Sequence, residues 1–147
     1  MEIDRGAPAT AEGEIEISAP PATVWEVLAD LAAWPTWNAD VRSVSVEGPV
    51  EPGTVFRWKS GPASLVSTLQ VVDEPREIAW TGVTMRIHAV HVFRLTPNGD
   101  GTTVRSEESW RGLIPTLLRG YSRSTLRSGI EKILAALKAE AERRTRG

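Results

Sequence analysis

Between residues 41 and 111 the sequence repeats one pattern six times: a short run with strand character, then a few turn residues. The runs are VRSVSVE, TVFRWKS, ASLVSTLQVVD, REIAWTG, RIHAVHVFRL and TTVRSEESWR, and the connections, among them GPVEPG, EP and NGDG, are rich in glycine and proline. Such short connections join neighbouring antiparallel strands, whereas parallel strands need a long crossover. The region therefore predicts a six-stranded antiparallel meander.

The segments on either side of the meander have different periodicities. EGEIEIS at 12–18 alternates in polarity like a half-buried strand, and SAPPATVWEVLADL begins with a serine and two prolines before apolar residues at helical spacing. AAWPTWNAD predicts a second, shorter helical turn. Residues 113–144 predict one long helix, bent near Gly120 or Gly129. Its apolar stripe consists of Leu117, Tyr121, Leu126, Ile130, Ile133, Leu134, Leu137 and Ala141.

The order of strand, two short helices, six strands and long helix predicts an α+β domain. A curved seven-stranded antiparallel sheet has one face that needs cover, and the single long helix can lie across it with room for a cavity. With 147 residues, of which 41 % are hydrophobic, the chain has the size of one domain. We expect residues 1–11, which show no periodicity, to form a flexible tail before a single domain at 12–147.

Composition excludes several function classes. The chain has no cysteine, so disulfides and thiolate metal sites are excluded. The N-terminus is acidic where a signal peptide would be basic and apolar, and no run approaches the roughly 20 apolar residues of a membrane span, so a cytoplasmic location fits best. No pattern matches a phosphate-binding loop, a dinucleotide-binding fold or a Ser-His-Asp arrangement, and no cofactor is expected.

Charge is distributed unevenly along the chain. Residues 1–110 contain 8 basic and 16 acidic side chains, whereas residues 111–147 contain 9 basic and 3 acidic ones. Arg119, Arg123 and Arg127 follow an i, i+4, i+8 spacing and so line one outer stripe of the last helix. A solvated helix face beside an acidic body explains this pattern best. Contact with a membrane surface or an acidic partner stays open, whereas nucleic-acid binding has no support.

The only two histidines, His88 and His91, lie three positions apart in RIHAVHVFRL. On a strand, residues three apart point to opposite faces, so these side chains cannot share a metal ion. His91 shares its face with apolar residues and should point into the cavity, while His88 should face solvent. If NGDG forms a four-residue hairpin loop, His91 lies opposite Glu108, and a register slipped by two residues would place Ser106 there instead.

In this register two titratable groups, the carboxylate of Glu108 and the partly desolvated imidazole of His91, lie side by side on an apolar wall. Burial would lower the pKa of His91 and an ionised Glu108 would raise it, and the sequence leaves the balance open. The pair could contact a polar group of a ligand, form an unspecialised part of the wall, or act as general acid and base. One inward histidine and one glutamate fall short of the three or four ligands of a metal site.

The order and spacing of several segments resemble one known family. EIEISAPPATVWEVLADLAAWPTWN, GTVFRW, EPREIAWTG, AVHVFRL and GDGTTVRSEESWRG, spread over about residues 12–143, are similar to the polyketide cyclase/dehydrase-like branch of the START-related helix-grip superfamily, SRPBCC. The resemblance implies a helix-grip fold, in which seven antiparallel strands grip a long C-terminal helix around a deep, mostly apolar pocket. It also implies lipid-, sterol- or polyketide-like ligands and, in some members, ring closure or dehydration.

Strand alternation selects further candidates for the cavity wall, although for each tryptophan a place in the core is the simpler reading. Trp37 and Asn38 resemble the family's segment at the pocket entrance, where an asparagine can direct a hydrogen bond to an otherwise apolar ligand. Tyr121 can present its hydroxyl from the last helix. The predicted ligand-binding residues are Trp37, Asn38, Phe56, Trp58, Trp80, His91, Phe93, Ser106, Glu108, Trp110 and Tyr121.

Three functional hypotheses of different classes result. The first is a protein that binds a small hydrophobic ligand, and the second is a polyketide aromatase/cyclase or dehydratase with His91 and Glu108 as acid and base. The third is an interaction or stress-response module with a vestigial pocket. An enzyme that stabilises an enolate or alkoxide needs donors aimed at that oxygen, and few inward candidates exist. The sequence does not distinguish a monomer from a homodimer.

Overall fold

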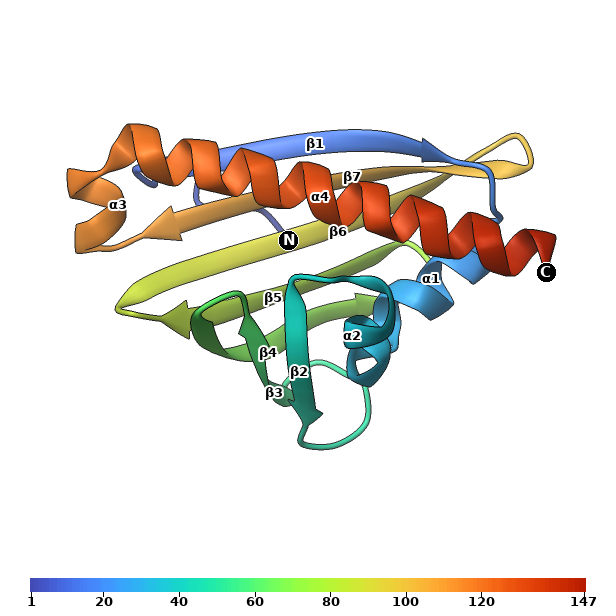
Figure 1. The fold of residues 1–147 in the computed structure, drawn as a ribbon, viewed down its shortest axis with the longest axis horizontal. Helices are drawn as coiled ribbons and strands as arrows, with labels where there is room; N and C mark the ends of the chain where they lie inside the picture. Colours follow the sequence, from blue (N-terminus) through green and yellow to red (C-terminus); the bar gives the residue numbers. More distant parts are fainter.

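Seven antiparallel strands form one sheet in the computed structural model, which describes residues 1–147 (Figure 1). The strands are β1 (Ala9–Ile17), β2 (Val41–Val46), β3 (Val55–Ser60), β4 (Ala63–Asp73), β5 (Glu77–Thr84), β6 (Ile87–Asn98) and β7 (Gly101–Arg111). Their order in the sheet is β1-β7-β6-β5-β4-β3-β2. The predicted meander is confirmed, and the first strand completes the sheet by pairing with the last.

Helices connect β1 to β2 and follow β7. The first group is α1 (Pro21–Ala29), the 3-10 turn η1 (Leu31–Ala33) and α2 (Trp34–Trp37), and the second is α3 (Leu113–Leu117) and α4 (Arg119–Arg146). The prediction of one continuous helix over 113–144 is therefore wrong, because the structure has two helices there. The helix is broken at Leu118, not bent near Gly120 or Gly129, because Leu118 leaves the helical region with φ −120° and ψ 54°.

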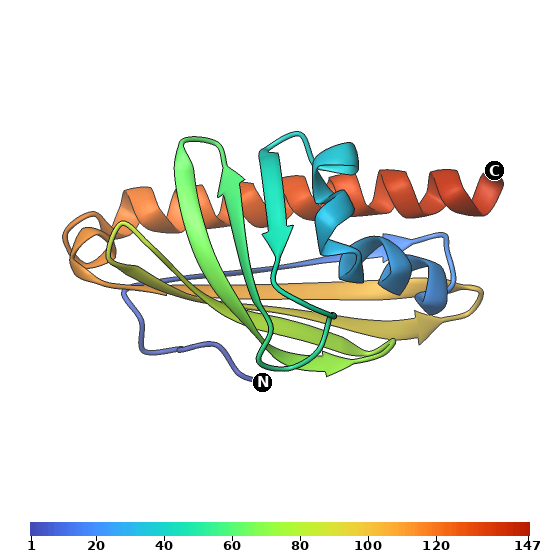
Figure 2. The same ribbon diagram turned by 90° about the horizontal axis from the view of Figure 1, so that it is seen from below.

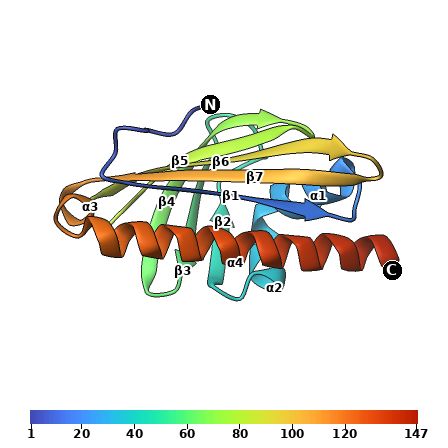
Figure 3. The same cartoon turned by 90° about the horizontal axis from the view of Figure 1, so that it is seen from above.

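The helix α4 lies along the concave face of the sheet, and the first residues of the chain cross the opposite face (Figure 2). The view from above shows the same arrangement (Figure 3). Gly13 of β1 allows the close approach of α4, since a Cβ at this position would lie 2.9 Å from Cγ2 of Ile130. The sheet and the C-terminal helix thus form the predicted helix-grip fold.

Two residues of the predicted apolar stripe do not face the sheet. Leu117 belongs to α3, before the break, and its side chain is exposed. Tyr121 is 72 % exposed because it lies five residues before the buried Leu126, which corresponds to about 140° around the helix axis. The buried face of α4 consists of Ser122, Leu126, Ile130, Leu134, Leu137 and Ala141.

Trp34 is the centre of the aromatic core at the end of the sheet covered by α1 and α2. Its ring lies 5.7 Å from the ring of Phe56, 5.4 Å from that of Trp58 and 5.3 Å from that of Trp80. The indole Nε1 donates a hydrogen bond to the carbonyl of Leu28 at 3.0 Å. Because Trp34 joins α2 to β3 and β5, it holds the short helices against the concave face.

The N-terminal residues make defined contacts with the convex face of the sheet. The strand β1 begins at Ala9, three residues before the predicted start, so part of the predicted tail belongs to the sheet. Ile3 is buried and packs in a small cluster with Ala79 and Val92. These contacts are long-range, which explains why the segment shows no local periodicity.

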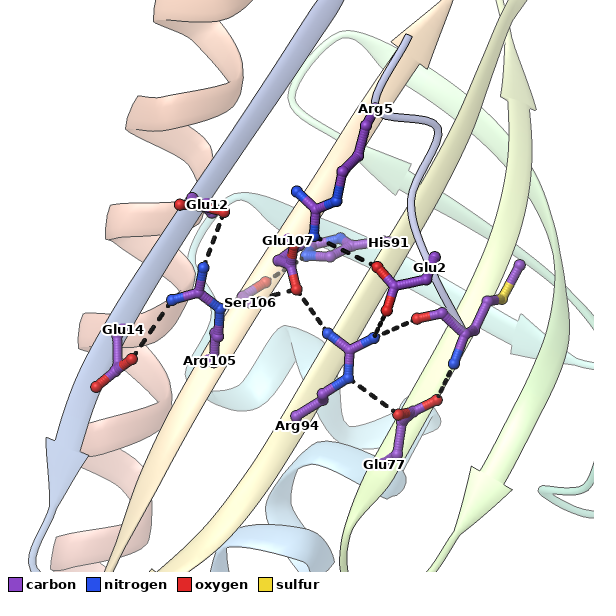
Figure 4. Close-up of polar contacts among 11 residues, drawn as sticks. Glu2, Arg5, Glu12, Glu14, Glu77, His91, Arg94, Arg105, Ser106 and Glu107 are labelled. Atoms are coloured by element: carbon purple, nitrogen blue, oxygen red, sulfur yellow. Dashed lines mark hydrogen bonds and ion pairs between the residues drawn. The ribbon is translucent and has the colours of Figure 1, made fainter. Parts of the chain in front are cut away.

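Glu107 is the centre of an ion-pair network on the convex face (Figure 4). Its buried carboxylate accepts hydrogen bonds from the guanidinium groups of Arg5 and Arg94, each at 2.6 Å. Arg94 also contacts Glu77, which binds the N-terminal amine of Met1 at 2.6 Å. Burial alone would raise the pKa of Glu107, but the hydrogen bonds and charges of Arg5 and Arg94 outweigh burial and lower the pKa.

Substitution Glu107→Gln should destabilise the protein by about 1–3 kcal/mol at pH 7, because two arginines would lose a buried partner. Glu12→Gln is the matched control, since Glu12 pairs with Arg105 at the surface, and it should cost less than about 1 kcal/mol. Urea unfolding measures both. The lowered pKa means that the contribution of Glu107 is present above its unfolded value and is lost as the pH falls, so the effect should shrink below about pH 4. Equal costs for the two variants would contradict the assigned network.

Candidate functional site

A cavity of about 450 Å³ lies between the sheet and the N-terminal half of α4. It exists because small side chains meet there. Ser67, Gly82 and Ala89 are register partners on β4, β5 and β6, and all three line the cavity. From the opposite wall, α4 contributes Ser122, Thr125 and Gly129.

Seven of the eleven predicted ligand-binding residues line this cavity. They are Asn38, Trp58, Trp80, His91, Glu108, Trp110 and Tyr121. Phe56 and Phe93 are instead fully buried in the hydrophobic core, since the aromatic cluster around Trp34 fills that end of the sheet. Trp37 packs against the edge of the core, and its buried Nε1 has no hydrogen-bond partner. Ser106 is fully buried and does not reach the cavity.

Sequence reasoning missed the small residues of the wall. Ser67, Gly82 and Ala89 have the same strand parity as the inward aromatic residues, so alternation carried the signal that could have found them. They were not predicted because the candidates for the cavity wall were chosen among large aromatic and polar side chains. The mouth of the cavity is formed by Met85 in the turn between β5 and β6, by Ile114 of α3 and by Tyr121, all of which are exposed.

The predicted register of β6 and β7 is confirmed, because His91 lies opposite Glu108. The hairpin loop is two residues shorter than expected, since Asn98 and Gly101 also pair. The buried His91 and the exposed His88 lie on opposite faces of β6, as the strand parity predicts.

The two ring nitrogens of His91 both contact other side chains. Nε2 lies 2.8 Å from Oγ of Ser106, and Nδ1 lies 3.3 Å from Oε1 of Glu108. Trp110 donates its Nε1 hydrogen to Oε2 of the same carboxylate at 2.9 Å. Next to an ionised Glu108, the neutral imidazole carries its proton on Nδ1 and accepts from the Ser106 hydroxyl at Nε2.

Burial is the larger influence on His91. It lowers the pKa of the imidazole, and the opposing charge of Glu108, which raises the pKa, does not compensate. His91 is therefore neutral at pH 7. Since its pKa is lowered in the folded state, its contribution to stability is lost as the pH falls below the unfolded value of about 6.5.

Substitution Glu108→Gln should lower the pKa of His91 further, because it removes the only charge that raises the pKa and leaves the burial. Proton NMR of the imidazole signals measures the shift. The imidazole signals of His88, on the other face of β6, serve as the internal control. A rise in the pKa of His91, or equal responses of both histidines, would contradict the assigned contact.

The side chains of Ser106, His91 and Glu108 contact one another in the order serine, histidine, carboxylate, as in the catalytic triad of a serine hydrolase. The amino-acid sequence itself shows no hydrolase motif. The three residues lie on two strands, and only the hairpin brings them together. Ser106 is 0 % exposed, so a substrate in the cavity cannot reach its hydroxyl. With both nitrogens of His91 engaged, Glu108 is the member of this group with acceptor capacity left for a ligand.

Comparison with known families decides the identity of the fold. The profile of the family described as polyketide cyclase / dehydrase and lipid transport matches residues 8–142. The chain belongs to this family. The match covers all seven strands, both walls of the cavity and most of α4.

Solved structures similar to this polyketide cyclase / dehydrase family member share its fold at low identity. A START superfamily protein from Mycobacterium smegmatis has a TM-score of 0.75 at 16 % identity, with 91 % of this chain and 97 % of that chain covered. The Zhui aromatase/cyclase from Streptomyces sp. R1128 has a TM-score of 0.72 at 20 % identity, with 92 % and 94 % covered. The protein TTHA0849 from Thermus thermophilus reaches 0.78 at 19 % identity, with 90 % and 96 % covered.

Two further results complete the comparison. Among curated proteins, none matches the sequence of this family member significantly. None of its helices combines the length and the apolar composition that crossing a bilayer requires.

Proposed function

We propose that this protein binds a small, largely hydrophobic molecule in the cavity between the sheet and α4. The cavity itself carries the proposal, because its volume of about 450 Å³ falls within the range of ligand sites in proteins, roughly 300–1,000 Å³. Its walls are mainly apolar and include Trp58, Trp80 and Trp110. An unfilled apolar space of this size costs stability, so its small wall residues are better explained by a ligand than by packing.

The family and its structural relatives support the same ligand class. The family description names polyketides and lipid transport, and one of the similar structures is an aromatase/cyclase. Lipids are largely apolar, and polyketides are carbon chains or fused rings that carry carbonyl and hydroxyl groups. A cavity with three tryptophans and one group of polar side chains around Glu108 suits such a molecule.

Acid–base catalysis on a polyketide-like chain is the second candidate, and the position of Glu108 favours it. The carboxylate faces the cavity, accepts a hydrogen bond from Nε1 of Trp110 and lies 3.3 Å from Nδ1 of His91. In this scheme Glu108 accepts the proton, and His91 is a positioning residue because the protein occupies both of its nitrogens. Asn38 and Tyr121 are among the wall residues that can donate to a developing enolate oxygen.

Native mass spectrometry of freshly purified protein tests the binding function. We expect a bound small molecule at one per chain, or, after its removal, saturable quenching of tryptophan fluorescence by neutral polycyclic alcohols. Absence of both results would overturn the proposal. Ring closure of a poly-β-ketone thioester, followed by mass spectrometry and lost in Glu108→Gln, would assign catalysis in addition to binding.

A further inference from the structure

We infer that the ligand carries a hydrogen-bond donor, a hydroxyl or an ammonium group, and that the cavity discriminates against carboxylates. This inference rests on the proposed binding function and names the chemistry of its ligand. It follows from the charges and the hydrogen bonds of the cavity wall.

The wall of the cavity contains acidic side chains but no basic ones. Asp40 and Glu108 are among its 25 lining residues, and none of these residues is a lysine or an arginine. Arg94 and Arg105 lie on the strands that build the wall, but they belong to the convex-face network (Figure 4). Strand alternation explains why the arginines and the cavity lie on opposite faces of the sheet. On β6 and β7 the arginines occupy outward positions, whereas His91 and Glu108 occupy inward ones.

A carboxylate in this cavity would lose its hydration without gaining a counter-charge. Such a transfer is strongly unfavourable unless a cation or several donors replace the water. The amide of Asn38 and the hydroxyl of Tyr121 are neutral donors, which can serve a carbonyl but do not compensate a full negative charge. The ionised Glu108 would add repulsion.

Glu108 offers the ligand acceptor sites in the cavity wall. Trp110 donates to Oε2 and Nδ1 of His91 contacts Oε1, whereas a carboxylate can accept about four hydrogen bonds. The Glu108 side chain is 18 % exposed, and this exposed part lies at the cavity. A ligand hydroxyl or ammonium group placed there would gain a charge-assisted hydrogen bond.

Several other polar groups of the wall are engaged within the protein, whereas the buried hydroxyl of Thr84 has no hydrogen-bond partner. Oγ of Ser67 accepts from Nε1 of Trp58 at 3.0 Å. Oδ1 of Asn38 accepts from the backbone N–H of Asp40 at 3.1 Å. His91 is neutral, with Nε2 hydrogen-bonded to Ser106 and Nδ1 in contact with Glu108. The Thr84 hydroxyl can donate or accept, but Glu108 is the partly buried charged acceptor of the wall, so a ligand group that donates gains most there.

Isothermal titration calorimetry with matched probes tests this inference. The probes are 2-naphthylmethanol, 2-naphthylmethylamine and 2-naphthoate, and, on a linear scaffold, decanol, decylamine and decanoate. At pH 7 we expect the alcohol and the amine of at least one scaffold to bind with Kd values at least tenfold lower than that of its carboxylate. Glu108→Gln should weaken the amine about tenfold and reduce the difference between amine and carboxylate. Glu51→Gln removes an exposed acid that does not line the cavity and is the matched control, with changes below about threefold.

The outcomes separate this inference from the proposed function. Equal affinities of alcohol, amine and carboxylate, or tighter binding of the carboxylate, would overturn the inference and leave the binding function standing. Preserved discrimination in a folded Glu108→Gln variant would also overturn it, because another group would then be responsible. Absence of binding by all six probes would overturn the inference, and it would overturn the binding function as well if native mass spectrometry also found no bound molecule.

Discussion

Phenylalanine in place of Ala89 should abolish ligand binding while the protein stays folded. Ala89 lies in β6, between its register partners Gly82 and Trp110, and all three line the cavity. A ring at this position occupies the space above the row of small residues and meets the opposite wall on α4. We expect the Kd of 2-naphthylmethanol, measured by calorimetry, to rise at least a hundredfold.

The matched control adds the same ring on the other face of the sheet. Val83 is exposed, does not line the cavity and lies on β5, one residue from the inward Gly82. Val83→Phe should therefore leave the Kd unchanged. Circular dichroism should show both variants folded, because the added ring of Ala89→Phe enters an existing cavity and does not displace the core. Normal binding by Ala89→Phe would show that the ligand site lies elsewhere.

Truncation of Trp34 to alanine should have the largest effect on stability. The side chain is almost fully buried, contacts the rings of Phe56, Trp58 and Trp80, and donates to the carbonyl of Leu28. Its loss creates a large cavity in the core and should cost about 3–5 kcal/mol. For a chain of this length that corresponds to a melting temperature lower by roughly 6–20 °C in calorimetry.

Two substitutions separate the causes of this effect. Trp34→Phe keeps most of the packing but leaves the Leu28 carbonyl without its donor, so it should cost about 1–3 kcal/mol. Tyr121→Ala truncates an aromatic residue that is largely exposed and should change the stability by less than about 0.5 kcal/mol. If Trp34→Ala cost no more than Tyr121→Ala, the assignment of Trp34 as the centre of the core would be wrong.

Local patterns predicted the parts of the fold that depend on neighbouring residues. Turn residues at short intervals predicted the meander, and the NGDG turn predicted the register that places His91 opposite Glu108. Strand parity separated His91 from His88. These predictions succeeded because hairpin register and side-chain alternation are properties of a few consecutive residues.

Packing between distant segments decided what these patterns left open. Parity placed Phe56 and Trp58 on the same inward face, but only the position of Trp34 and α2 makes Phe56 part of the core and leaves Trp58 beside the cavity. The break at Leu118 directs Tyr121 to the mouth of the cavity and away from the buried face of α4.

By itself, the sequence determined the order of the elements and the opposite facing of His88 and His91, because these follow from backbone periodicity. Opposite His91 it left two alternatives, Glu108 and Ser106, and the structure selects Glu108. The tertiary structure alone decided where the cavity lies and that Glu108 keeps free acceptor sites in its wall. It also decided that Ser106 is sealed beneath His91 and that Glu107 is buried by the N-terminal residues. These features depend on which distant segments of the chain exclude water from a side chain. Such burial cannot be deduced from the residues that neighbour it in the sequence.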